Sequence, residues 1–162
     1  MLKSLLSSKM KKGLQDALHV ELYQSNLWKS LANQMQREGF FGSQKYFLAE
    51  SAEELTHYQL IVDFMNDMGD MADLPEIAAI TDKATTIGEA LNIGYDMEVD
   101  VLNQYKKLYS DALDSDVAVA KFVEQFLEIQ VKAVGHYGDL LSKYKTAEET
   151  KEILEFDEHI ND

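Results

Sequence analysis

A glutamate and a histidine stand one helical turn apart in the stretch SAEELTHYQL, at Glu54 and His57. Apolar residues recur around them with the period of an amphipathic helix, and both polar side chains fall on its apolar face. A carboxylate and an imidazole at positions i and i+3 can bind one metal ion together. The same spacing is common in surface pairs, so this pair alone leaves both interpretations open.

Three other helical segments interrupt their apolar faces with one polar residue each, at Glu21, Glu98 and Gln130. In a helical hairpin, residues equidistant from the turn face each other. Glu21 and Glu54 are equidistant from one predicted turn, and Glu98 and Gln130 are equidistant from another. The polar residues are therefore predicted to lie at one level, near the middle of a helical bundle.

Buried carboxylates at Glu21, Glu54 and Glu98 would repel one another and would be penalised by desolvation. No lysine or arginine occupies a matching position on the apolar faces. Divalent cations can compensate these charges, and a carboxylate that bridges two ions can hold a pair of them. Taken singly, His57 could be a hydrogen-bonded core histidine and Gln130 a satisfied buried amide. Their joint placement with the carboxylates predicts a metal centre.

The composition narrows the range of partners. The chain carries 29 acidic and 15 basic residues, a formal net charge of −14, which argues against nucleic acid because phosphate binding needs clustered Lys and Arg. An acidic surface that only maintains solubility is the alternative to cation binding. The absence of cysteine excludes disulfides and thiolate metal sites. No apolar run reaches the length of a membrane span or a signal sequence, so we expect a cytoplasmic protein without a membrane partner.

Helical periodicity predicts an all-α fold with helices at about 5–37, 43–68, 86–113, 117–144 and 147–160. Short loops make the first two helices and the next two into antiparallel hairpins. The connector between the hairpins, roughly 16 residues, can extend ~50 Å. The longer helices are each predicted to be ~40 Å long, so the connector can run the whole length of the bundle. The third helix is therefore predicted to run parallel to the second. The chain is predicted to be a single domain over residues 1–162.

The apolar faces can be assigned residue by residue. On the first helix the expected inward residues are Leu14, Leu18, Glu21, Ser25, Trp28, Ala32 and Met35. On the third helix they are Leu91, Tyr95, Glu98, Leu102, Tyr105 and Tyr109. The third helix is expected to start at a cap formed by Thr85 or Thr86, with Glu89 following.

The segments HVELYQSNLW, REGFFGSQKYFLAESAEELTHYQ and FVEQFLEIQV resemble the corresponding segments of the non-haem bacterial ferritins, in the ferritin-like diiron superfamily. EILEFDEHI resembles the fifth helix of these proteins, and the resemblance covers nearly the whole chain. It implies a ferritin-like four-helix bundle with a long crossover and a diiron ferroxidase centre. It also implies a hollow homo-oligomeric shell of 24 subunits that stores ferric mineral.

The resemblance implies a role for each polar residue. Glu21 and His57 would bind the first iron, Glu98 would bind the second, and Glu54 would bridge both. Gln130 matches a fourth-helix glutamine found near the second iron. These five residues are the expected catalytic set, and together with Glu53 they are the expected metal-binding set.

Some positions depart from the family pattern. Glu53 matches a family glutamate that is used for a nearby transit or third iron. In many bacterial ferritins, glutamates also flank the fourth-helix glutamine, and here Ile129 and Ala133 stand in their places. A third iron site built on those two glutamates is therefore not expected. Trp28 stands where family members usually carry a tyrosine. Haem-binding relatives use a methionine just after the bridging glutamate, and Leu55 stands there, so no haem is expected.

The sequence therefore predicts a ferroxidase that oxidises Fe(II) to Fe(III) with oxygen or hydrogen peroxide and deposits the product as mineral. Two other classes stay open: a diiron oxidoreductase or peroxide-scavenging bundle without storage, and a metal-free structural bundle. The last predicted helix is expected to pack against symmetry mates in the shell, because so short a helix cannot stabilise itself. Docking on its own bundle is the alternative.

Overall fold

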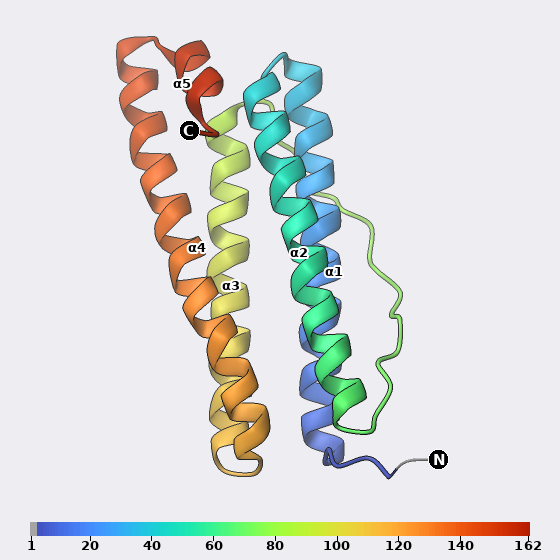
Figure 1. Cartoon of the computed structure of the whole chain (residues 1–162). Helices are drawn as coiled ribbons and strands as arrows, with labels where there is room; N and C mark the ends of the chain where they lie inside the picture. Colours follow the sequence, from blue (N-terminus) through green and yellow to red (C-terminus); the bar gives the residue numbers. More distant parts are fainter. Residues whose placement is uncertain (1–2) are drawn as a thin grey trace.

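The computed structural model describes residues 3–162, and these residues form five helices (Figure 1). They are α1 (Ser8–Glu38), α2 (Phe41–Asp67), α3 (Ile87–Leu113), α4 (Val117–Thr150) and α5 (Ile153–His159). The four long helices lie side by side, and α5 lies at the end of the bundle where α4 finishes. The all-α architecture expected from the sequence is confirmed. Within residues 3–162, no helix is both long enough and apolar enough to cross a membrane.

The segment between α2 and α3 is a long crossover, as predicted. It runs along the outside of the bundle from one end to the other, so that α3 runs parallel to α2 (Figure 1). Two side chains of α1 hold it in place: Gln15 exchanges hydrogen bonds with the backbone of Asp73, and Gln34 bonds the backbone of Asp82 and Ala84. The crossover is thereby fixed along α1 before the chain enters α3.

Side-chain caps set three of the helix starts. Ser7 caps α1, and Asp116 caps α4 by accepting from two backbone N–H groups. Thr86 and Glu89 form a complete capping box at the start of α3, which confirms the predicted cap. Gly39 ends α1 in the left-handed conformation, with φ of 88°, and so allows the tight turn into α2.

The start of α2 is capped by a residue of α5. Phe40 precedes α2 and has no side-chain acceptor, so the Asp157 carboxylate accepts hydrogen bonds from Gly42 N (2.9 Å), Ser43 N (2.7 Å) and Ser43 Oγ (2.6 Å). Asp157 is buried, and Ile160 belongs to the hydrophobic core. The last helix therefore docks on its own bundle through these residues, and its expected packing against symmetry mates stays a prediction.

Three predicted boundaries are wrong. α4 does not end at Tyr144 but continues to Thr150, because nothing in the intervening sequence breaks a helix. Lys151 in the left-handed conformation, with φ of 62°, ends it, so α5 starts after this residue rather than at residue 147. α1 begins at Ser8, after its cap, rather than near residue 5.

The core consists of two hydrophobic halves separated by a polar layer. One half contains Trp28 and Tyr137, and the other contains Leu18 and Phe126. On each of the four long helices, the buried polar residues fall between the residues of the two halves, apart from Ser43 at the start of α2. The main members of this layer are Glu21, Gln24, Ser25, Ser51, Glu54, His57, Glu98 and Gln130. The single polar level predicted from the sequence is confirmed.

The apolar faces follow the prediction closely on α1 and less closely on α3. All seven residues assigned to the inward face of α1 are buried. On α3 the chain buries Gly94, Val101 and Leu108, and Leu102 and Tyr109 are only half-buried. Gly94 is enclosed because the ring of Tyr137 lies against it, and a Cβ at this position would come within 2.3 Å of that ring.

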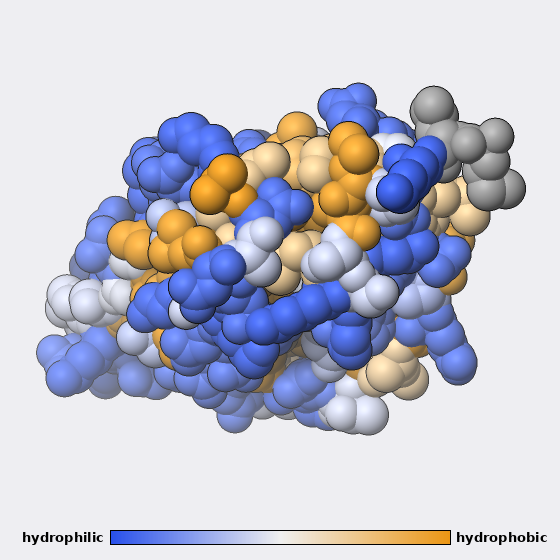
Figure 2. Space-filling view, turned by 90° about the horizontal axis from the view of Figure 1, so that it is seen from below, coloured by the Kyte–Doolittle hydropathy of each residue, from blue (hydrophilic) through white to orange (hydrophobic). Residues whose placement is uncertain are grey.

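The end of the bundle that carries the α3–α4 turn is mostly hydrophilic. Figure 2 shows this end, with hydrophobic side chains in separate groups among hydrophilic ones. Leu5, Leu113 and Val117 are exposed at 68%, 53% and 77% respectively. The polar layer lies away from this surface, in the middle of the bundle.

Candidate metal centre

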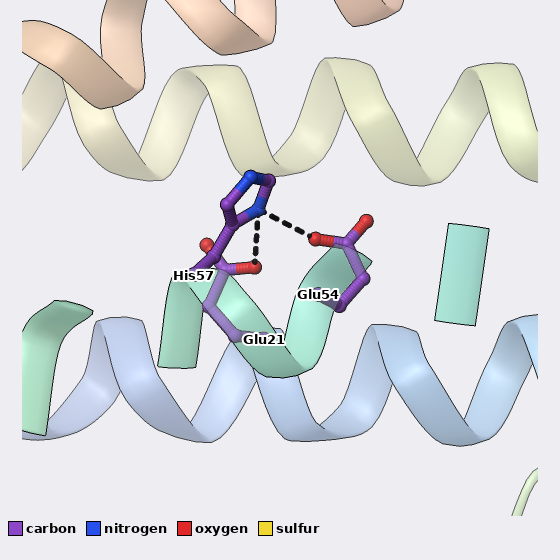
Figure 3. Close-up of side chains that lie close together, drawn as sticks. All are labelled: Glu21, Glu54 and His57. Atoms are coloured by element: carbon purple, nitrogen blue, oxygen red, sulfur yellow. Dashed lines mark hydrogen bonds and ion pairs between the residues drawn. The ribbon is translucent and has the colours of Figure 1, made fainter. Parts of the chain in front are cut away.

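Glu21 from α1 and Glu54 and His57 from α2 converge inside the bundle (Figure 3). The Nδ1 atom of His57 lies 2.9 Å from Glu54 Oε2 and 3.5 Å from Glu21 Oε2. One ligand atom from each of the three residues lies within 4.8 Å of the others, as a shared metal ion requires. All three side chains are buried, with residue exposures of 0%, 5% and 7%.

The electrostatics of this group favour a bound cation. Burial raises the pKa of Glu54 to about 7, and the neighbouring Glu21 carboxylate adds to this rise, while hydrogen bonds from His57 and Trp28 oppose it. Burial disfavours the charged form of His57, but its contacts with Glu21 and Glu54 outweigh this and raise its pKa to about 10. The metal-free group therefore holds a proton between two carboxylates, and a divalent cation bound by all three side chains would replace it.

Two aromatic residues outside this three-residue group donate hydrogen bonds to its carboxylates. The Tyr105 hydroxyl donates a short hydrogen bond to Glu21 Oε1, and the Trp28 indole N–H donates to Glu54 Oε1 at 3.0 Å. Glu21 Oε2 is buried without a hydrogen-bond partner among residues 3–162. A buried carboxylate oxygen without a donor is costly. This orphaned oxygen fits a metal ligand, because it faces His57 and the space that the three residues share.

Glu98 and Gln130 form a separate buried pair. Gln130 Nε2 donates to Glu98 Oε2 at 2.7 Å, and Gln24 Nε2 donates to the same oxygen at 3.3 Å. Burial, together with the charge of the nearby Glu54 carboxylate, raises the pKa of Glu98 to about 7. Glu98 therefore lies close enough to Glu54 for the two carboxylates to interact electrostatically. Glu98 does not belong to the group formed by Glu21, Glu54 and His57.

All the proposed ligands except Glu21 open onto one cavity of about 280 Å³. Its lining residues are Glu50, Glu53, Glu54, His57, Glu98, Ile129, Gln130, Lys132, Ala133 and His136. Glu53 is exposed and lies at the mouth, apart from the buried group. A cavity of this size has room for metal ions together with several waters, at ~30 Å³ for each water.

Sequence reasoning missed three contacts of this centre. It assigned Trp28 and Tyr105 to inward faces, but as packing residues, and it did not single out Gln24. Gln24 lies three positions after Glu21, on the same inward face, so its helical spacing could have identified it. The hydrogen bonds of Trp28 and Tyr105 depend on side-chain directions that spacing does not give.

The comparisons with known proteins point to one family. Residues 11–147 match the Ferritin-like domain family. The chain is 24% identical over 140 residues to a probable bacterial non-heme ferritin-like protein of Haemophilus influenzae, covering 86% of this chain and 85% of that protein. It is 26% identical over 129 residues to the bacterial non-heme ferritin of Staphylococcus haemolyticus, covering 79% of this chain and 78% of that protein.

The fold agrees with this assignment. An open pore ferritin from the hyperthermophilic archaeon Archaeoglobus fulgidus superposes with a TM-score of 0.90 at 23% identity, covering 94% of this chain and 96% of that chain. The similarity therefore includes the long crossover and the paired hairpins as well as single helices. Because the family match spans most of the sequence, this chain belongs to the ferritin-like domain family.

Proposed function

We propose that the protein oxidises Fe(II) at a pair of metal positions in the polar layer and stores the Fe(III) as mineral. The observation that supports this most directly is the buried group of Glu21, Glu54 and His57, whose carboxylates have no lysine or arginine partner within residues 3–162. Membership of the ferritin-like family and relatives named non-heme ferritin support iron as the substrate.

Each residue has a specific role in this proposal. Glu21, Glu54 and His57 bind one Fe(II), and Glu54 extends to a second ion bound by Glu98 beside Gln130. Gln130 and Gln24 orient the Glu98 carboxylate through their amide N–H groups. Because Gln130 is neutral, the second position has fewer anionic ligands than the first, and we expect it to bind iron more weakly.

Proton release accompanies metal binding. His57 and Glu54 together hold a proton in the metal-free protein, and Glu98 is partly protonated near neutral pH. All three must lose their protons to act as ligands. The two Fe(II) ions then supply two electrons, which reduce oxygen to hydrogen peroxide, or hydrogen peroxide to two waters, with two protons consumed in either case.

We further propose that the subunits assemble into a hollow shell of 24 copies in which the mineral is deposited. The surplus of acidic residues supports this, because carboxylates on an inner surface would guide and nucleate iron. In this proposal Asp157 of α5 caps α2 within the subunit, and the exposed Leu154 is left for contacts between subunits. A diiron oxidase without storage would instead be a small oligomer.

The test is oxidation kinetics on protein of known size. Light scattering first establishes the assembly, and anaerobic Fe(II) loading is then followed by oxygen in a stopped-flow instrument. Wild-type protein should oxidise two Fe(II) per subunit in a fast phase, and Glu54→Ala should lose that phase while remaining folded. Relieving carboxylate repulsion should leave its metal-free stability unchanged or higher. A fast phase of wild-type rate in Glu54→Ala would contradict the assignment.

A further inference from the structure

A second cavity, of about 320 Å³, lies between α1 and α3. It shares no lining residue with the cavity that the proposed metal ligands line. Its volume falls within the range of pockets that bind small molecules, which begins at ~300 Å³. The proposed function makes no use of this cavity, so its shape and charge call for a separate explanation.

Small side chains leave this space open. α1 and α3 are antiparallel (Figure 1), and Gly13 lies opposite Leu108, because a Cβ on Gly13 would come within 2.5 Å of Leu108 Cδ1. Two turns along each helix from this contact, ~10 Å, Val20 of α1 and Val101 of α3 also line the cavity. Ala17 lies between Gly13 and Val20 and contributes only a methyl group. The two helices are therefore separated here by a gap with an apolar floor.

Tyr105 adds an aromatic ring to this floor. The residue is only 3% exposed, and its ring stacks on Phe126 at 5.0 Å between centroids. Its hydroxyl is already used in the hydrogen bond to Glu21, so the part of Tyr105 that borders the cavity is its apolar ring. Aromatic rings pack favourably against other apolar or aromatic groups. The floor therefore favours an occupant with an apolar body.

Lysines stand on both sides of the cavity mouth. Lys12 of α1 pairs with Asp16 at 2.6 Å. Lys107 of α3 pairs with Asp111 at 2.9 Å, and Lys9 reaches the same aspartate at 3.3 Å. Three ammonium groups thus meet two carboxylates, which leaves a local charge of +1 in a chain whose net charge is −14.

The rim has unused hydrogen-bond donors. A lysine ammonium has three N–H donors. Lys12 and Lys107 each donate one hydrogen bond, to the aspartate four positions later on the same helix. The two aspartates are already paired, so a cation would find no free carboxylate at this mouth. An anion could instead accept hydrogen bonds from lysines of both helices.

We propose that this cavity binds a small organic anion, with its apolar body on the floor and its carboxylate between Lys12 and Lys107. The apolar body would cover Ala17, Val20 and the ring of Tyr105, and the carboxylate would stay at the solvent-exposed rim. The chain forms this site without any metal ion. The proposal therefore does not depend on the proposed function, and it can be tested on metal-free protein.

Calorimetric titration with 2-naphthoate, which has an aromatic body and one carboxylate, tests the site. Metal-free wild-type protein should bind one 2-naphthoate per chain with a Kd below roughly 1 mM. The amide 2-naphthamide has the same body without the charge and should bind roughly tenfold more weakly. Absence of saturable 2-naphthoate binding, or equal affinity for the acid and the amide, would contradict the proposal.

Variants place the ligand in the cavity. Ala17→Phe fills the floor and should weaken 2-naphthoate binding by more than about tenfold. The double variant Lys12→Gln, Lys107→Gln should weaken it by roughly threefold to tenfold and leave 2-naphthamide binding unchanged, since exposed ion pairs contribute modestly. Lys143→Gln, Lys145→Gln is the matched control, because it removes two exposed lysines of α4 that do not line the cavity, and it should bind as wild type does.

The two variants test different parts of the site. Circular dichroism verifies that each one is folded, and the lysine variant keeps the test decisive if Ala17→Phe does not fold. Wild-type affinity for 2-naphthoate in folded Ala17→Phe would show that the molecule binds elsewhere and would overturn the proposal. Equal 2-naphthoate affinities in the Lys12, Lys107 variant and its α4 control would also overturn it, because the rim would then not hold the carboxylate.

Discussion

The indole N–H of Trp28 donates a 3.0 Å hydrogen bond to Glu54 Oε1, while Glu54 Oε2 lies 2.9 Å from His57 Nδ1. The two oxygens of the proposed bridging carboxylate are therefore held by different helices. Trp28 stacks on Phe47 and on Tyr137, at 6.1 and 5.8 Å between centroids, so its ring cannot turn without moving the core. An indole donates but does not accept, so Trp28 orients Glu54 without competing for a metal ion.

This contact makes the fluorescence of Trp28 a reporter of metal binding. Trp28 is the single tryptophan of the chain. Zn(II) binding should change its emission, with saturation at the stoichiometry of the centre, and Glu54→Ala should abolish the change. The control Phe47→Leu alters the packing of the indole but keeps its hydrogen bond, and it should retain the response. A Zn(II) response of full size in Glu54→Ala would show that the indole does not sense this carboxylate.

Removing the indole donor should weaken the centre. Trp28→Phe keeps an aromatic ring but leaves Glu54 Oε1 buried without its partner. We expect the free energy of unfolding to fall by about 1–3 kcal/mol, measured by denaturant titration. The pKa of Glu54 should rise, so the pH at which Zn(II) binds half-maximally should move upward. A pH profile identical to that of wild type would rule out the orienting role.

The metal-free protein should lose stability as the pH rises. Burial raises the pKa values of Glu54 and Glu98 from 4.5 to about 7, so the folded chain binds more protons than the unfolded chain between these values. The extra protons bound by the folded chain contribute fully to the free energy of unfolding below the pKa of the unfolded chain. This contribution is lost as the pH rises through the pKa of the folded chain. The pKa of His57, raised from 6.5 to about 10, acts with the same sign at higher pH.

Denaturant titration at several pH values measures this effect. Between roughly pH 5 and 8 the free energy of unfolding should fall by several kcal/mol, up to about 3 kcal/mol for each of the two carboxylates. Glu54→Gln should flatten the curve, and saturating Zn(II) should reverse its slope because metal replaces the protons. A stability that rises with pH over this range in metal-free wild-type protein would contradict the pKa shifts.

Gln130→Glu should lower the stability of the metal-free protein and raise its affinity for the second metal ion. The wild-type amide donates to Glu98 Oε2 at 2.7 Å, and a carboxylate there would remove the donor and add repulsion. We expect the metal-free variant to lose about 2 kcal/mol or more and to bind the second ion more tightly. Gln125→Glu adds the same charge on the exposed face of α4 and should change neither quantity. Equal Zn(II) affinity in Gln130→Glu and wild type would show that residue 130 does not face the metals.

Asp157 of α5 caps the start of α2, and this cap should contribute measurably to the free energy of unfolding. Asp157→Ala removes the acceptor for two backbone N–H groups and a hydroxyl, and should cost about 1–3 kcal/mol in unfolding experiments. Asp139→Ala, on an exposed turn of α4, should cost much less. Gly42→Ala should also displace α5, because a Cβ there would come within 1.7 Å of the Asp157 carbonyl oxygen. Equal stability of the Asp157 and Asp139 variants would contradict the capping role.

The parts of this structure that could be predicted are those controlled by local pattern. The level of Glu21, Glu54, Glu98 and Gln130 follows from helical spacing and the positions of the two turns. The capping box of Thr86 follows from residues three positions apart. Both depend on short-range geometry that the sequence contains directly.

The unpredicted parts depend on partners distant in sequence. Asp157 caps a helix whose first turn lies more than a hundred positions earlier, and no local pattern indicates this pairing. The inward face of α3 is displaced because Tyr137 of α4 packs on Gly94, which only tertiary contact determines. The assignment of Tyr105 as a donor to Glu21 needs a side-chain direction as well as a helical face.

The most direct test of the central claim is anomalous diffraction from crystals of the protein soaked with Fe(II) under anaerobic conditions. We expect two iron peaks in the polar layer of every subunit. One should be bound by Glu21, Glu54 and His57, and the other should lie between Glu54 and Glu98. Iron found only on surface carboxylates, with the buried group still joined by the His57–Glu54 hydrogen bond, would contradict it.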